Sequence, residues 1–453
     1  MALSRPGAIG ASAAALAASL LLLLIVLINP AGAAEPTGHG FVGVASCAGS
    51  TCHGRSEANG KIVRQDELMI WQNPASVAGS HSRAWRVLAE PRAKAIASRL
   101  GIGEAASAPM CLGCHASAAA ARSQPSDGVG CESCHGAASG WLASHYAVGG
   151  THAANVSRGM VPLDDPRVRA ERCLDCHFGS AEDGRFVDHR IMAAGHPRIS
   201  FELDLFSTLQ QHHNEDGDYV QRKGRSNGVT TWAVGQAAAL ERSLALFATP
   251  GRGTEGLFPE FYFFDCHSCH RRISDDPRFE PSAEGNPGRP IPSGTPPYND
   301  ENMIMLAAAA RVAAPQVAPR FERDSRAFHS ALTKDRATAV AAAARLRESA
   351  HAVAADLSRG VSRAQLFDIV DTIAGNAVAP RFTDYAGSVQ AVMAVDTLLS
   401  ALVASGEVGA GQAGSIRGDI NLAYRAVRDP NSYSPREFRA SLGRAAAAIR
   451  KLK

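Results

Sequence analysis

The pattern of apolar and polar positions changes character along the chain. An apolar run extends from Ala11 to Ile28, and no later segment is expected to be long and apolar enough to span a membrane. After residue 301, apolar residues recur at helical spacing in an alanine-rich background. The pattern predicts a mostly α protein with little regular sheet, in which residues 301–453 form a helical bundle.

The bundle region carries clear signals for individual helices. Gly406 can end a helix with one apolar face, formed by Val389, Val392, Met393, Leu399 and Leu402. The segment from Ser434 to Glu437 has the pattern of a capping box with proline in the first turn. A last helix should follow, with Phe438, Leu442 and Ile449 on one face. We expect five to seven helices after residue 301, and we interpret His329 and His351 as ordinary core or surface residues.

The N-terminal run is typical of a secretory signal peptide over residues 1–33. Arg5 gives a short, positively charged N-terminal region, Pro30 interrupts the apolar run, and the small residues 31–33 are suitable for signal-peptidase cleavage. The run is longer than most such segments, so an uncleaved membrane anchor is an alternative. The expected location is the periplasm.

The length and net charge of the chain limit the number of domains and the classes of protein that fit. The chain has 453 residues, enough for two or three domains, and a formal net charge of +3. A nucleic-acid binder would be expected to concentrate basic residues, so the near-balanced charge argues against that class.

The cysteines give the most specific signal. All 10 cysteines fall into pairs, and a histidine follows each pair directly. Four pairs read C-x-x-C-H and the first reads C-x-x-x-x-C-H, which predicts five covalently attached c-type haems. The thiols would bind the porphyrin edge and the histidine would bind the iron from the proximal side. The five sites are Cys47–Cys52–His53, Cys111–Cys114–His115, Cys131–Cys134–His135, Cys173–Cys176–His177 and Cys266–Cys269–His270.

Other uses of paired cysteines fit less well. Zinc ribbons combine two pairs at each metal, which would leave one of the five pairs over and the histidines unexplained. Disulfides within such short loops would crosslink almost nothing, and a thioredoxin-like motif does not recur five times. At the first site, four small residues (Ala48–Thr51) can bulge between the cysteines. The alternative there is a single thioether on Cys52, with Cys47 free.

The motifs also predict the organisation of the chain. They occupy 224 residues, about 45 per motif, too few for an ordinary side-chain core around each haem. The haem-free chain should therefore be largely unfolded in this part. We expect a pentahaem domain over residues 40–272, a linker rich in proline and glycine over residues 273–300, and a haem-free helical domain over residues 301–453.

Further histidines can bind the opposite, distal face of each iron. Of the 16 histidines, 11 do not directly follow a cysteine pair, and most of them lie near the sites. By local context we expect distal ligands at His81, His145, His189 and His196, with His152, His212 and His213 as further candidates. Ligation by two histidines closes the iron to substrates and suits electron transfer, whereas an open sixth position allows chemistry on small molecules.

Two segments resemble the cytochrome c-554 family, Val129–Gly136 around the third motif and His81–Trp85. A third, Ala194–Leu203, is similar to a stretch that recurs in related multihaem proteins. The resemblance covers roughly residues 40–275 and implies a mostly helical fold with haems in stacked and perpendicular pairs. In that family a tetrahaem carrier accepts electrons from hydroxylamine oxidation, and its second haem is five-coordinate. The extra motif, the enlarged first loop and the long helical tail depart from the family pattern.

Three functional interpretations follow. The first is a periplasmic electron carrier that exchanges electrons with soluble or membrane-bound redox proteins and has no catalytic residues. The second is an enzyme in which one open haem acts on a small nitrogen or sulfur compound. In the third, the helical tail assembles copies of the chain or docks a membrane partner. The number of high-spin haems would distinguish the first two.

Overall fold

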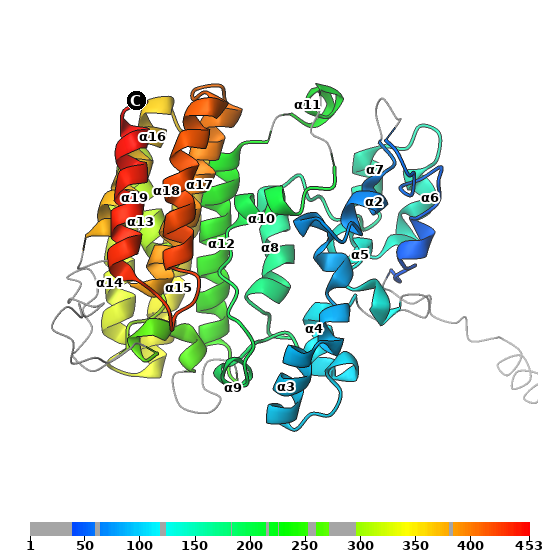
Figure 1. The fold of residues 1–453 in the computed structure, drawn as a ribbon, viewed down its shortest axis with the longest axis horizontal. Coiled ribbons are helices and arrows are strands. Elements are labelled where there is room, and N and C mark those ends of the chain that lie inside the picture. The colour runs from blue at the N-terminus through cyan, green and yellow to red at the C-terminus, as the bar shows by residue number, and fades with distance from the viewer. Residues whose placement is uncertain are drawn as a thin grey trace, which may run out of the picture.

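The computed structural model describes residues 39–58, 64–117, 124–182, 184–213, 217–224, 226–251, 260–270, 296–379 and 384–453. These residues are mostly α-helical, as predicted, and no β-strand occurs among them beyond an isolated bridge between Phe264 and Tyr298. The predicted signal peptide and most of the predicted linker lie outside the described residues. Figure 1 shows long parallel and antiparallel helices gathered on one side and short helices on the other.

Residues 39–200 form what we call the short-helix lobe. Glycine and alanine are frequent here and amphipathic runs are short, so most helices have only one or two turns. The lobe contains α2 (Glu67–Trp71), α3 (Pro91–Leu100), α4 (Pro109–His115), α5 (Cys131–His135), α6 (Leu142–His145), α7 (His152–Val156), α8 (Pro166–His177) and α9 (His189–Ala193). Its largest separate apolar cluster is small and centres on Leu88, Ala97 and Ala105.

The helical bundle, our name for α12 to α19, has long helices with wide apolar faces. It consists of α12 (Gly228–Ala248), α13 (Glu301–Ala313), α14 (Ala318–Ala331), α15 (Arg336–Leu357), α16 (Arg363–Val378), α17 (Tyr385–Ala404), α18 (Ala410–Ala426) and α19 (Pro435–Arg450). Two further helices, α10 (Leu203–Leu209) and α11 (Gly217–Lys223), connect the lobe to the bundle. Seven described helices thus follow residue 300, within the expected range.

The main core crosses the position where the sequence predicts a domain boundary. Helix α12 precedes the fifth motif, yet it packs against α13, α15 and α17. Its residues Trp232, Leu240 and Phe247 belong to the same buried cluster as Phe321 and Phe438 of the C-terminal helices. The buried side chains of α12 therefore attach residues 228–248 to the bundle, although these residues lie on the N-terminal side of the linker.

Two expectations about the bundle need correction. Ser434 precedes α19, but its side chain makes no capping hydrogen bond; proline at the first turn is the only predicted start signal that operates. A capping box forms instead at α16, between Ser362 and Gln365. Helix α17 is long and apolar enough to cross a membrane, contrary to our expectation, but most of its apolar stretch is buried inside the bundle.

Charged pairs and a close helix contact join the lobe to the bundle. Arg167 of α8 donates two hydrogen bonds, of 2.8 and 2.6 Å, to the carboxylate of Glu241 on α12. Arg242 of α12 lies 2.8 Å from Asp175 of α8. Gly235 of α12 lies so close to α10 that a Cβ there would be 2.4 Å from the Cβ of Leu203. The lobe therefore rests on α12 through specific contacts.

Candidate haem sites

The second, third and fourth motifs each form the end of a helix. Helices α4, α5 and α8 end at His115, His135 and His177. In a helix, residues three and four positions apart lie on the same face, so each motif presents both thiols and its histidine to one side. The helical conformation thus arranges the three groups as one haem attachment requires. The fifth motif has a short 3-10 turn, Cys266–Ser268, in the same place.

The first motif reaches a comparable arrangement through a wider loop. Cys52 donates its backbone N–H to Gly49 over 2.8 Å, and His53 donates to Cys47 over 3.1 Å. A Cβ at Gly54 would be 1.9 Å from the backbone oxygen of Ala48, so only glycine allows the loop to close this tightly. The two extra residues are therefore accommodated within the loop, and His53 is still presented beside its cysteines.

Every motif histidine faces a second histidine. The ring centroids are 6.1 Å apart for His53–His145, 6.2 Å for His81–His177, 6.3 Å for His115–His196 and 6.2 Å for His189–His270. His135 faces both His212, at 6.3 Å, and His213, at 6.0 Å. Segments far apart in sequence thus meet in histidine pairs at all five motifs.

These separations fit an iron ion between the two rings. A metal–imidazole bond is about 2.0 Å, and a five-membered ring with bonds of about 1.35 Å places each nitrogen about 1.15 Å from the ring centre. Two opposed ligands therefore place their ring centres about 6.3 Å apart. The observed range, 6.0–6.3 Å, agrees with this value in all five pairs. The residues present thus fit haem iron held by two histidines.

The third motif has two histidines opposite its own. Potential ligand atoms of His135, His212 and His213 all lie within 4.8 Å of one another. His212 is half-buried and its Nδ1 lies 3.0 Å from the carbonyl oxygen of Gln210, which leaves Nε2 for a metal. His213 is exposed, and its Nδ1 lies 3.9 Å from Glu67. Burial and the carbonyl contact favour His212 as the ligand.

The remaining candidate histidines do not face a motif histidine. His152 lies 3.2 Å from Asp164, with both side chains exposed. His329 is buried in the bundle, where its Nδ1 lies 2.9 Å from the carbonyl oxygen of Ser325. His351 is exposed beside Glu241. Of the seven expected distal candidates, the structure therefore places six opposite a motif histidine and His152 elsewhere.

The outward nitrogens of the motif histidines have different partners. His53 Nδ1 lies 3.0 Å from Glu67 Oε2, and His115 Nδ1 lies 2.7 Å from the carbonyl oxygen of Ala84. His177 Nδ1 is buried and has no hydrogen-bond partner among the described residues. Sequence reasoning did not find Glu67 or Ala84, because neither lies in a motif and only the fold brings them to the rings.

Burial keeps several of these histidines in the neutral form that binds metals. Burial lowers the pKa of His177 to about 4, and the nearby His81 adds to the shift. Burial, followed by the neighbouring His213, lowers the pKa of His135 to about 3. At neutral pH both imidazoles are therefore uncharged and can donate a lone pair. At His53 the hydrogen bond to Glu67 instead raises the pKa.

Cysteines of different motifs approach one another in two places. The neighbouring Cys131 lowers the pKa of Cys47, and the neighbouring Cys176 raises the pKa of Cys114, so each pair of thiols is close enough to interact. Cys114 and Cys176 also line a cavity of about 240 Å³ with Glu132 and Arg172. The buried Glu132 carboxylate accepts N–H groups from residues 42, 43 and 138, which ties the first and third motifs together. The attachment edges of sites one and three, and of sites two and four, therefore lie close together.

The fifth site lies where the lobe meets the bundle. His189 begins α9 in the lobe, whereas His270 belongs to the motif loop on the bundle. That loop is fixed by His267, whose Nδ1 lies 3.0 Å from the Pro430 carbonyl oxygen. Asp265 also accepts a hydrogen bond of 3.2 Å from the backbone N–H of Ala386 on α17. Both parts of the molecule thus supply this site.

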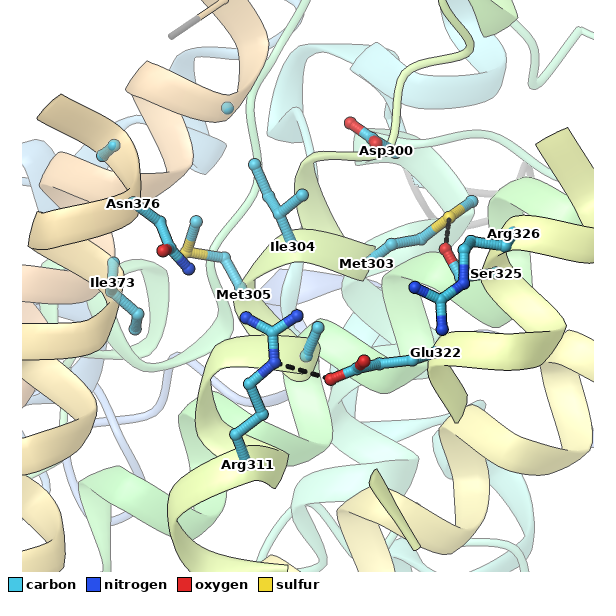
Figure 2. A pocket seen from close by; sticks show the side chains of 13 residues that line it. Asp300, Met303, Ile304, Met305, Arg311, Glu322, Ser325, Arg326, Ile373 and Asn376 are labelled. Carbon is cyan, nitrogen blue, oxygen red and sulfur yellow. Dashed lines mark hydrogen bonds and ion pairs between the residues drawn. The ribbon is translucent and has the colours of Figure 1, made fainter. Parts of the chain in front are cut away.

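The bundle contains a separate cavity with a different lining. Figure 2 shows it between α13, α14, α16 and α17, with Met303, Ile304 and Met305 beside the ion pair of Arg311 and Glu322, whose atoms lie 2.6 Å apart. No cysteine or histidine is among its described lining residues. This cavity is therefore unrelated to the motifs.

Comparison with known families supports the motif interpretation. Residues 46–136 match the family model described as cytochrome c554 and c-prime, a segment that contains the first three motifs. This segment is similar to the cytochrome c554 family over those residues. The enlarged first loop therefore lies within the family segment. No curated protein and no solved structure matches the chain. The match to this family supports covalently bound haem c and a role in electron transfer.

Proposed function

We propose that the protein is a periplasmic pentahaem cytochrome c that carries electrons between redox proteins. One observation carries the proposal: each of five motif histidines faces another histidine at 6.0–6.3 Å. Bound haem supplies an iron that alternates between the ferric and ferrous states. Two histidines at each iron leave no coordination position for a substrate, so the arrangement favours electron transfer over catalysis.

The ligand pairs follow from the facing rings. We assign His53 with His145, His115 with His196, His177 with His81, and His270 with His189. His135 is paired with His212, with His213 as the alternative. In particular, His196 lies opposite His115, so the second site is not expected to be five-coordinate as in the tetrahaem carrier of the family.

The location and partners rest on the sequence. The apolar N-terminal run favours export, and c-type haem is attached outside the cytoplasm. A periplasmic carrier would exchange electrons with soluble or membrane-bound redox proteins. If the N-terminal run is not cleaved, it would anchor the protein to the membrane.

Haem stoichiometry and spin state test the proposal. A pyridine haemochrome assay and the intact mass should give five haems per mature chain, and four would mean that the first motif is empty. The EPR spectrum of the oxidised protein should contain low-spin signals only. A stoichiometric high-spin signal would contradict ligation by five histidine pairs and support the enzyme interpretation.

A matched pair of substitutions tests the ligand assignment. His145 and His152 lie close together in sequence after the third motif, but only His145 faces a motif histidine. His145→Ala should convert one haem to high spin, whereas His152→Ala should leave all five low-spin. A high-spin haem in His152→Ala and none in His145→Ala would assign His152 as the ligand in place of His145.

A further inference from the structure

The buried carboxylate of Glu67 contacts the motif histidine of the first site, His53. Glu67 begins α2 and is 8% exposed. Its Oε2 lies 3.0 Å from His53 Nδ1, and the same imidazole ring faces His145. The carboxylate therefore contacts the His53 ring at Nδ1 and leaves Nε2 available to bind iron.

The same position differs at two other sites. At His115 the acceptor is the backbone carbonyl of Ala84, at 2.7 Å, and at His177 no acceptor is present among the described residues. A carboxylate is a stronger acceptor than a carbonyl, because it bears a full negative charge. These three motif histidines thus form a series from a charged acceptor, through a neutral acceptor, to none.

The acceptor changes how strongly the imidazole donates to the metal. An Nδ1–H group that donates to a carboxylate shifts negative charge onto the ring and makes the ring more basic. A more basic ligand stabilises ferric iron more than ferrous iron, and this lowers the reduction potential. We infer that Glu67 is a positioning residue that acts through His53 to make the first haem more reducing than it would otherwise be. This inference rests on the proposed haem at that site.

The effect should be local to the first site. The other oxygen of Glu67 lies 3.9 Å from His213 Nδ1, beyond hydrogen-bonding distance, and His213 is the exposed alternative opposite His135. Removing the charge should therefore change the potential of the first haem more than that of the third. Among the described residues, Glu67 has no hydrogen bond or ion pair with a histidine of the second, fourth or fifth site.

Redox titration of the full holoprotein tests the inference. In Glu67→Gln the side chain keeps its size and can still accept a hydrogen bond, but it loses its charge. One of the five potentials should rise by about 59 mV, which is a tenfold change in the ferric-to-ferrous equilibrium for one electron. Asp164→Asn is the matched control. It neutralises another carboxylate, 3.2 Å from His152, which faces no motif histidine, and it should leave all five potentials unchanged.

Two further measurements keep the outcomes separate. Five haems with wild-type potentials in Glu67→Gln would overturn the role of Glu67 and leave the proposed function intact. Absence of haem from the first motif of the wild-type protein would overturn the proposed function itself. If the Glu67→Gln variant does not acquire its haems, EPR of the wild-type protein tests the role of Glu67 instead. One low-spin species should have g values shifted toward those of imidazolate-ligated haem, and five species of the ordinary neutral-imidazole type would contradict the inference.

Discussion

The two sides of the molecule are held together by different means. The bundle buries many large side chains in one cluster, including Trp232, Phe247, Phe321, Phe328 and Phe438. Over a similar length, the short-helix lobe has only small apolar clusters, and its motif cysteines and histidines take the places where a core would lie. We therefore expect the bundle to fold through its own side chains and the lobe to need porphyrin surface to exclude water. The pattern of apolar residues that predicts the bundle therefore says little about the short-helix lobe.

The sharpest test of this difference removes the haem. When the chain is produced without haem attachment, we expect protease to degrade residues 39–200 quickly and to leave a resistant fragment that contains residues 301–453. The reason is that the bundle retains its side-chain core, while the lobe loses most of its buried surface. Mass spectrometry of the fragments provides the measurement, with the holoprotein digested in parallel as the control. Equal resistance of both parts would contradict the comparison.

Truncating a core side chain should affect the bundle first. Phe438 is fully buried, so Phe438→Ala should lower the free energy of unfolding by about 3–5 kcal/mol. Urea unfolding followed by far-UV circular dichroism measures the loss, and the haem absorption of the folded protein should not change. Leu422→Ala, at a residue that is 39% exposed, should have little effect. A similar loss in both variants would argue against a well-packed core at Phe438.

A smaller effect is expected where the lobe rests on the bundle. Gly235→Ala would push a methyl group into Leu203, and we expect a loss of about 1–3 kcal/mol. Gly375 lies within α16 with no neighbouring atom near an added Cβ, so Gly375→Ala should stabilise the helix by up to about 1 kcal/mol. Thermal unfolding of the two variants should therefore shift in opposite directions. A rise in the unfolding temperature of both variants would mean that α10 and α12 can separate without cost.

A pH-dependent effect is expected at the same junction. Burial, together with nearby Asp204, raises the pKa of Glu202 to about 7, although its carboxylate accepts a 2.7 Å hydrogen bond from Thr397. The usual value for an unfolded chain is about 4.3, so between these pH values the folded state binds more protons. The free energy of unfolding should then fall as pH rises, by at most about 1.4 kcal/mol per pH unit.

Glu202→Gln should remove this part of the pH dependence, because the amide does not titrate. Urea unfolding at several pH values between 4.5 and 7 measures the slope in the variant and in the wild type. Glu171→Gln, at an exposed position on α8, serves as the control and should keep the wild-type slope. An unchanged slope in Glu202→Gln would show that this carboxyl is already ionised in the folded protein.

The sequence predicted local features better than long-range ones. The helical faces around Val392 and Phe438 and the helix end at Gly406 could be predicted, since each depends on a few neighbouring residues. The membership of α12 in the bundle could not, because only tertiary packing joins it to helices beyond the linker. Similarly, local context selected the histidines near the motifs, including His152, which faces no motif histidine. It could not predict which histidine faces which motif. Pairing depends on contacts between residues as distant as His81 and His177.

The fifth pair has a consequence for the order of assembly. It takes His189 from the lobe and His270 from the loop that α17 and the turn before α19 hold in place. If the chain is exported from its N-terminus, as we propose, the other four pairs would be available first, since they are complete by residue 213. The fifth pair would then form only after the C-terminal helices have been exported and the two parts have docked. We therefore expect a complete set of ligands at this site to mark a fully folded molecule.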